Sequence, residues 1–341
     1  MDTAQIPQTV PDQLFRCRDS KLFMETGQAR KNESILSDAT LAHEVDQALW
    51  KNEVLRAMDY YEIDVQVINR IVILSGHITS STSNDRLEKA ISLIPGILGL
   101  HNNLVLDDKL TIEVASALDH LEHLYNCKFF TGVSHGVVTL HGNVNDENIK
   151  SLAEKCVASN SNVRGVINCV RVLGSVSELQ DPTIYQPAIG QEILFLNGVS
   201  GIVRQVIINP DNRRVVAMTL AGRFTDQQQE FRSMSNNEVR PPERLIVVSV
   251  KMIRYLTKFS GFLTISSKER NRSVDFDPAA FCSPNVDWIP PYPYCPQDVL
   301  FPVGEKLFGQ PVASFPLQSR LGIKLNAVLD DLVQTNDSLG G

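Results

Sequence analysis

The sequence VILSGHI at residues 72–78 returns as VTLHGNV at residues 138–144. In both copies apolar residues alternate with other residues up to a glycine, and the offset is 66 residues, the difference between 138 and 72. The same offset joins GLHNNL to GVINCV further along the chain. The positions that the copies share are Gly76, Gly99, Asn102, Gly142, Gly165 and Asn168. A constant offset over this length predicts one structural motif that occurs twice.

Each copy is expected to contain two helices and three strands. Apolar residues at helical spacing follow Asp38, and an alternating run then turns back at Asn69-Arg70 as a hairpin. An amphipathic helix comes next, and Pro95-Gly96 ends it before the third strand. The predicted fold class is therefore α+β. Its two αββαβ repeats, at residues 39–108 and 109–174, each form a three-stranded sheet covered on one face by two helices.

The strings that carry this pattern resemble a tandem of BON domains. They are IDVQVINRIVILSGHI with GLHNNLVL in the first copy, and GVVTLHGNV with VRGVINCVRV in the second. Arg70 stands at the turn where that family usually has glycine. The resemblance implies modules associated with envelope or phospholipid contact and, in some cases, with binding a small ion. It implies no enzyme activity.

A second composition follows a polar linker at residues 175–186. Residues 187–266 contain alternating strands separated by Asn197-Gly198 and by the turn sequence NPDN at 209–212, which predicts a small antiparallel β-barrel. The strings IGQE, NGVSGIV and VVSV resemble the PRC-barrel family. Ser249 stands where that family commonly has a proline.

The two ends of the chain differ from these regions. Residues 1–38 are polar and are expected to form a disordered leader. Residues 267–341 are expected to form a proline-rich extended tail, because nine of the 17 prolines lie between residues 276 and 316. Apolar residues at helical spacing from 321 to 332 predict one short helix near the end.

The sequence shows no pattern typical of a targeting signal or a membrane-spanning helix. No basic stretch followed by an apolar run begins the chain, and no apolar run approaches the roughly 20 residues of a spanning helix. We therefore expect a cytoplasmic protein that touches a membrane only from its inner face.

Charge is spread unevenly and indicates where an anionic partner would bind. The chain has a net charge of −7, yet residues 187–275 carry 13 Lys and Arg against 8 Asp and Glu. Arginines in this segment are either a solvated surface or a contact for RNA phosphates or lipid headgroups. The candidates for this contact are Arg204, Arg213, Arg214 and Arg223. Arg213 and Arg214 follow a turn, so at least one is expected to project from the barrel rim.

The remaining side chains suggest no catalytic, cofactor or metal site. All seven histidines lie between residues 43 and 141, and His120 with His123 or His135 with His141 could share a face. No carboxylate or cysteine completes a zinc ligand set, so we interpret the histidines as surface or hairpin residues. The six cysteines show no CxxC spacing, and no serine lies in a GxSxG string.

These observations favour a non-enzymatic adaptor that binds partner proteins or phospholipid surfaces. One alternative is an RNA-associated or ribosome-associated assembly factor that acts through the basic barrel, although RNA is the weaker partner prediction. Another alternative is a small-ion sensor that uses backbone oxygens of the repeats. The oligomeric state and the identity of the partner stay open at this level.

Overall fold

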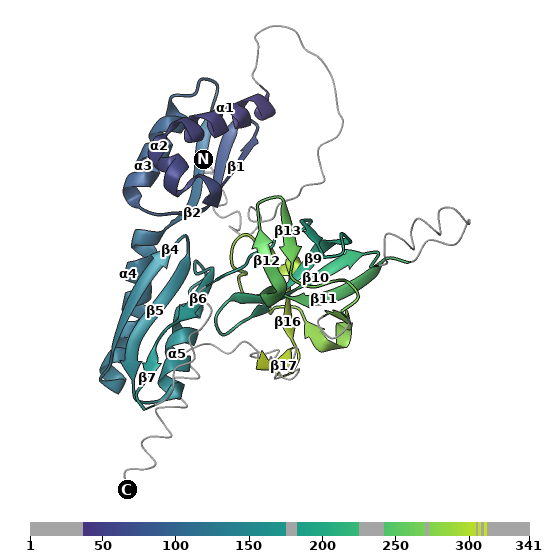
Figure 1. The fold of residues 1–341 in the computed structure, drawn as a ribbon. Coiled ribbons are helices and arrows are strands. Elements are labelled where there is room, and N and C mark those ends of the chain that lie inside the picture. Colours follow the sequence, from purple (N-terminus) through teal and green to yellow (C-terminus); the bar gives the residue numbers. More distant parts are fainter. Residues whose placement is uncertain are drawn as a thin grey trace, which may run out of the picture. The chain divides into compact units, whose positions relative to one another are not determined.

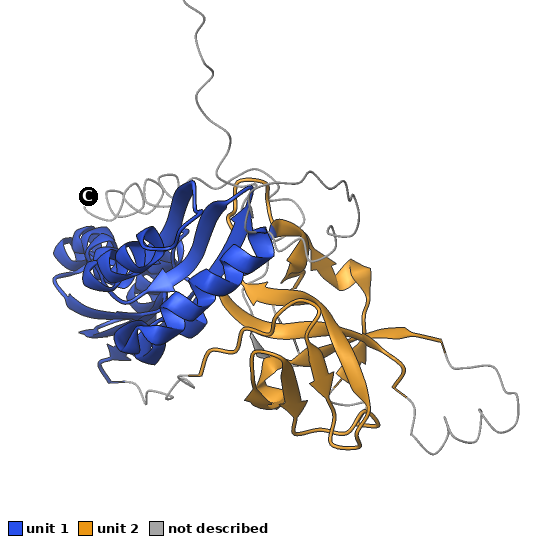
Figure 2. Ribbon diagram, turned by 90° about the horizontal axis from the view of Figure 1, so that it is seen from above, with its two compact units in different colours: residues 1–178, 291–295 blue, residues 179–290, 296–341 orange. Residues whose placement is uncertain are grey.

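The computed structural model describes residues 37–174, 183–224, 242–269, 273–304, 306–307 and 310–311. Backbone contacts divide the chain into two compact units, coloured separately in Figure 2. Unit 1 comprises residues Met1–Glu178 and Pro291–Cys295, and unit 2 comprises Leu179–Pro290 and Pro296–Gly341. The expected disordered leader, apart from its last two residues, and the helix expected at 321–332 lie outside the described residues.

Repeat 1 of unit 1 has the predicted order of elements, with one additional short helix and one 3-10 turn before its first strand. Ser37 is the N-cap of its first helix and accepts a hydrogen bond from the Thr40 amide, one residue before the predicted start at Asp38. Its helices and strands are α1 (Asp38–Lys51), α2 (Glu53–Met58), the 3-10 turn η2 (Tyr60–Glu62), β1 (Ile63–Ile68), β2 (Ile71–Ile78), α3 (Ser81–Ser92) and β3 (Gly99–Leu106).

Repeat 2 follows without an intervening loop. Its elements are α4 (Asp107–Tyr125), β4 (Lys128–Ser134), β5 (Val137–Val144), α5 (Glu147–Ala158), β6 (Gly165–Asn168) and β7 (Arg171–Val172). The third strand, expected as one piece, is divided into β6 and β7, which both pair in parallel with β5. The break falls at Cys169 and Val170, where the Cys169 amide still donates to the Leu140 carbonyl at 2.8 Å.

The two repeats share one topology, as the repeated sequence predicts. In each sheet the hairpin strands are antiparallel and the third strand lies parallel to the middle one, in the orders β1-β2-β3 and β4-β5-β6. Helices α1 and α3 cover one face of the first sheet, and α4 and α5 cover one face of the second (Figure 1). Alternating residues of the middle strands, such as Val72 and Leu74 or Val138 and Leu140, are buried beneath these helices.

The shared glycine within each middle strand is required by a close backbone approach. A Cβ atom on Gly76 would lie 2.1 Å from the Glu62 carbonyl oxygen, and one on Gly142 would lie 2.6 Å from that of Lys128. Both glycines also have positive φ, +118° and +154°. Only glycine fits such a position without moving the neighbouring strand.

The shared asparagine links the third strand of each repeat to the helix that follows the hairpin, α3 or α5. Asn102 donates to the Glu88 carboxylate at 2.7 Å. Asn168 donates to the Glu154 carboxylate at 3.0 Å and is almost wholly buried. In both repeats the asparagine side-chain oxygen accepts from the amide two residues later, so one side chain satisfies polar groups on two elements.

Unit 2 is built on one mixed sheet. Its strands are β8 (Glu192–Leu194), β9 (Ser200–Asn209), β10 (Arg214–Gly222), β11 (Arg244–Ser249), β12 (Ile253–Leu256), β13 (Ser260–Leu263), β14 (Ser273–Asp275), β15 (Phe281–Cys282) and β16 (Val299–Pro302). Strands β17 (Lys306–Leu307) and β18 (Gln310–Pro311) pair with each other in a separate sheet. Short 3-10 turns occur at η3 (Val250–Met252), η4 (Pro278–Ala280) and η5 (Pro296–Asp298).

The sheet of unit 2 differs from the expected small antiparallel barrel. Its path runs β12-β13-β8-β9-β10-β11-β14, and within the described residues its two ends, β12 and β14, are not paired with each other. Two of its pairings are parallel, β13 with β8 and β16 with β9. Strand β16 comes from the proline-rich region, and its Leu300 packs with Ile207 and Val247. The sheet therefore extends beyond residue 266.

Candidate functional site

The junction of the two repeats begins at a buried carboxylate. Asp107, the first residue of α4, accepts hydrogen bonds from the amides of His135 at 2.5 Å and Gly136 at 2.9 Å. Asp38 holds the equivalent hairpin of repeat 1 through the amides of Asn69 and Arg70, both at 2.8 Å. All four turn residues have positive φ, which the two-residue hairpin turn requires. Arg70 adopts this conformation in place of glycine, and its Nε donates to the Gly96 carbonyl at 2.7 Å.

Two charged pairs cross from repeat 2 to repeat 1. The His135 imidazole lies 3.5 Å from the carboxylate of Asp59, whose side chain is completely buried. The Arg164 guanidinium is paired with the Glu62 carboxylate and donates to the His135 carbonyl at 3.1 Å. Because these side chains are largely shielded from water, their mutual orientation is more strongly constrained than that of a surface ion pair.

A buried histidine completes the junction. The Nε2 atom of His77 lies 2.9 Å from the Asn162 carbonyl oxygen of repeat 2. Its ring packs on Gly136 so closely that a Cβ atom there would lie 2.3 Å from the same nitrogen. Tyr292, which belongs to unit 1, lies edge-on to His77 at 5.8 Å and carries Arg164 over its ring at 5.6 Å. The interpretation of the histidines as surface or hairpin residues is thus wrong for His77 and correct for His135.

The charges at the junction move the pKa values of its acids and of His135. The Asp59 carboxylate raises the pKa of His135, and the nearby Glu62 and Asp107 add to this effect against desolvation. Burial alone would raise the pKa of Asp59, but hydrogen bonds from His135 and Thr79 outweigh it and lower this pKa. For Asp107 the balance is opposite, and burial raises its pKa.

The junction is expected to lose stability as the pH rises above 6.5 and passes through the raised pKa of His135. The folded pKa of His135 lies above its ordinary value of 6.5, so its contribution is complete below that pH and is lost as the pH passes through the raised pKa. The unfolding midpoint of unit 1, followed by circular dichroism, should fall over this range. His135→Asn should remove most of the pH dependence, because asparagine does not titrate. Asparagine also tolerates the φ of +47° at this position, so the turn should be kept. An equal slope in both proteins would assign the effect to another group.

A cavity of about 310 Å³ opens beside these contacts and is lined by both repeats. Repeat 1 contributes residues of β2 and β3, and repeat 2 contributes residues of α4 and of the connection between α5 and β6. The side chains around it offer an amide at Asn103, a cation at Lys109, a carboxylate at Glu113 and the ring of Tyr292. The cavity can therefore accept a partner group with mixed polar and apolar character.

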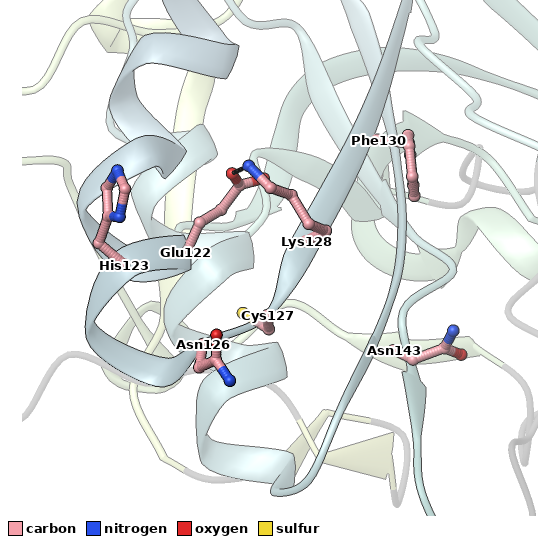
Figure 3. A pocket seen from close by; sticks show the side chains of 7 residues that line it. All are labelled: Glu122, His123, Asn126, Cys127, Lys128, Phe130 and Asn143. Carbon is pink, nitrogen blue, oxygen red and sulfur yellow. Dashed lines mark hydrogen bonds and ion pairs between the residues drawn. The ribbon is translucent and has the colours of Figure 1, made fainter.

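A second cavity, of about 420 Å³, lies within repeat 2 alone. Figure 3 shows Glu122 and Lys128 directed toward each other, while Phe130 and Asn143 come from the strands on the other side. Lys128 and Glu122 form an ion pair, and the Phe129 amide donates to the same carboxylate at 2.8 Å. The charges of Glu122 and Lys128 in this cavity thus satisfy each other.

The four arginines expected to meet an anionic partner do not form one surface. Arg213 is only 2% exposed, donates to the Ile289 carbonyl at 2.9 Å and lies over the Trp288 ring at 5.1 Å. It therefore supports the interior of unit 2. At least one of Arg213 and Arg214 was expected to project from a rim, and Arg213 does not. Arg214 is half-buried and donates to the Thr183 carbonyl. Arg204 and Arg223 are exposed, and Arg204 lies 3.8 Å from Glu243.

Arg213→Ala is expected to destabilise unit 2 by about 2–4 kcal/mol, because it removes a buried cation, its carbonyl contact and its packing on an indole. The matched variant Arg204→Ala removes an exposed guanidinium and should change stability by less than about 0.5 kcal/mol. Urea titration of both variants, monitored by Trp288 fluorescence, measures the difference. Similar midpoints for the two variants would contradict the structural role given to Arg213.

The described residues contain neither a candidate metal site nor a helix that could span a membrane. Among the described residues, no group of three or more His, Cys, Asp or Glu side chains is arranged to hold a metal ion. None of the helices in the described part of the chain is long and apolar enough to cross a membrane.

Comparison with protein families adds a name for the repeated fold. The family model of the BON domain matches residues 37–108 and 132–174. Both repeats match the BON domain. The matched segments cover most of the two BON repeats and less than half of the chain. They do not include residues 187–266, so the PRC-barrel resemblance of unit 2 stays a prediction.

Two solved structures are similar to part of the chain. Both are of CdsD, described as a structural protein of the type III secretion system of Chlamydia trachomatis. The first has 18% sequence identity and a TM-score of 0.34, and it covers 40% of this chain and 64% of that chain, which is less than two thirds. The second, its C-terminal domain, has 17% identity and a TM-score of 0.35, covering 42% and 70%. No curated protein matches the chain.

Proposed function

We propose that this chain is a non-enzymatic adaptor whose two BON repeats act together as one binding module for a partner protein. The observation that carries the proposal is the junction. Buried contacts of Asp59, His77 and Arg164 hold the repeats in one arrangement, and a cavity lined by both repeats lies beside them.

The direct connection of the repeats supports the same proposal. Strand β3 ends at Leu106 and α4 begins at Asp107, so no flexible linker separates the two sheets. A binding surface shared by two rigidly joined repeats loses less conformational entropy on association than two independently moving repeats would. The match to the BON domain, a module associated with phospholipid or partner binding, agrees with this interpretation.

The proposal can be tested by filling each cavity separately. Asn103→Trp places an indole in the cavity that both repeats line, and Asn143→Trp places one in the cavity of repeat 2 alone. Wild-type and variant full chains are immobilised and exposed to extract of the native host, and the bound protein is quantified. We expect Asn103→Trp to lose at least about tenfold in binding, because an ordered contact surface is blocked. Asn143→Trp should bind like wild type.

Two outcomes would overturn the proposal. One is equal binding by wild type and Asn103→Trp, which would place the contact elsewhere. The other is loss of binding by Asn143→Trp alone, which would assign the function to repeat 2 without its neighbour. Thermal unfolding of each variant confirms that the repeats stay folded during the assay.

A further inference from the structure

The sheet of unit 2 ends in an exposed aromatic hairpin. Strands β12 and β13 form this hairpin, and β12 is an end of the sheet path. Tyr255 is 60% exposed, Phe262 is 42% exposed, and Phe259 in the connecting turn is 84% exposed. Aromatic side chains of this size on a solvent-facing surface mark an interaction site more often than isolated exposed residues do.

The strand register places Tyr255 and Phe262 on one face. Tyr255 lies opposite Phe262, and Phe262 in turn lies opposite Leu194 of β8, so an apolar row crosses three neighbouring strands. In the next row, Gly261 and Ile193 are paired and buried, and the Ile193 side chain lies on the other face. The row therefore belongs to the outward face of the sheet.

A bulge adds a cation to the same face. The register of β12 shifts between Ile253 and Tyr255, which leaves Arg254 as an extra residue, and both Arg254 and Tyr255 are exposed. Lys258, also exposed, precedes Phe259 in the turn. We call the set of these residues the hairpin patch: Leu194, Arg254, Tyr255, Lys258, Phe259 and Phe262.

The turn that presents Phe259 is fixed by hydrogen bonds. The Thr257 hydroxyl oxygen accepts from the amides of Phe259 at 3.1 Å and Ser260 at 3.0 Å. The Thr257 carbonyl accepts from the side chain of the buried Gln191 at 2.7 Å. A contact made by Phe259 thus requires little ordering of the turn, which favours binding.

Charge in this part of the chain indicates an anionic partner. Residues 244–268 contain five Lys and Arg and no Asp or Glu, although the whole chain carries a net charge of −7. Glu192, opposite Ser260 on β8, is one exposed carboxylate near the hairpin. Cations beside exposed aromatic and aliphatic side chains are typical of surfaces that enter the headgroup region of an anionic bilayer.

We propose that the hairpin patch attaches the protein to anionic lipid bilayers, with Phe259 entering the interface and Arg254 and Lys258 contacting headgroup phosphates. Single-stranded RNA is bound in positively charged grooves lined by aromatic platforms. Here the most exposed ring lies at the tip of a hairpin, which suits insertion into lipid better. The inference goes beyond the proposed function, because it assigns a membrane contact to unit 2 and leaves the partner-binding cavity to the paired repeats.

The test uses the full chain and vesicles of phosphatidylcholine alone or mixed equally with phosphatidylglycerol. Wild type should sediment with the mixed vesicles, and Phe259→Ser should bind roughly tenfold more weakly, because the apolar contact is lost. Arg254→Ser with Lys258→Ser should weaken binding at low salt, with a loss that shrinks toward about 1 M salt. The matched control is Val286→Ser, which changes an apolar residue of unit 2 that is 89% exposed, and it should bind like wild type.

A tryptophan at the tip reports insertion directly. Phe259→Trp should show a blue shift of its emission with the mixed vesicles, relative to the wild-type signal of Trp50 and Trp288. Equal binding by Phe259→Ser and wild type, or no binding of wild type to the mixed vesicles, would overturn the inference. Displacement of vesicles by polyuridylate would replace lipid with RNA as the partner.

Self-association provides a further alternative outcome. If Phe259→Ser changes the oligomeric state in light scattering and leaves vesicle binding unaltered, the hairpin patch joins copies of this chain and the lipid inference fails. None of these results depends on Asn103→Trp. Failure of the lipid inference is therefore distinguishable from failure of the paired-repeat function.

Discussion

Gly142→Val is expected to destabilise repeat 2 by about 3 kcal/mol or more, combining backbone strain with overpacking. The glycine has a φ of +154°, and a Cβ atom on it would lie 2.6 Å from the carbonyl oxygen of Lys128. Valine is stiff at χ1 and cannot relieve this contact by rotation. The approach involves two paired backbones, so relief would require β4 and β5 to separate.

The matched control for this variant lies on the adjacent strand. A Cβ atom on Gly132 would meet nothing within 4 Å, so Gly132→Val should change stability by less than about 1 kcal/mol. Denaturant unfolding with hydrogen exchange of the repeat 2 amides measures both. Comparable destabilisation by the two variants would show that the glycine motif does not reflect a close approach.

Asp107→Ala is expected to cost about 2–3 kcal/mol, since it leaves two buried amides without their acceptor. Asp107 is 4% exposed, and its carboxylate binds the turn amides of His135 and Gly136. The turn in question positions His135 against Asp59, so the variant should also weaken the contact between repeats.

Repeat 1 contains the natural control for this change. Asp38 binds the equivalent turn amides but is more exposed, so water can replace the lost carboxylate, and Asp38→Ala should cost about 1 kcal/mol. Midpoints from urea titration of the two variants decide the comparison. A larger effect at Asp38 than at Asp107 would contradict the importance given to the buried position.

The topology of the repeats could be predicted because its causes are local. Alternation at Val72 and Leu74 fixes which strand face is buried, and the recurrence of these positions 66 residues later shows that the pattern occurs twice. Asn102 and Asn168 were also found by recurrence. Their role, binding a helix carboxylate, is visible only in the structure.

The junction could not be predicted from the repeated pattern, because it depends on how the two copies dock. Several of its residues differ between the copies. His77 corresponds to Asn143 at the common offset, and Arg164 corresponds to Leu98. Such differences at equivalent positions are the signal that the sequence contained, since the two copies contact different neighbours there.

Unit 2 shows the limit of reasoning from turns and charge. Arg213 follows a turn sequence, which suggested exposure, but its partner Trp288 lies 75 residues further along the chain (288 minus 213). The cation and aromatic residues of the hairpin patch share a face only because of the bulge at Arg254. A strict alternation would have placed Arg254 and Tyr255 on opposite faces.

Native-state hydrogen exchange tests most directly whether the junction makes the two BON repeats one module. Leu140→Ala removes a completely buried side chain from the core of repeat 2, at an expected cost of about 2–5 kcal/mol. We expect the amides of β2 in repeat 1 to lose protection together with those of β5. If β2 keeps its wild-type protection while β5 alone exchanges faster, the repeats unfold independently, which contradicts their coupling through the junction.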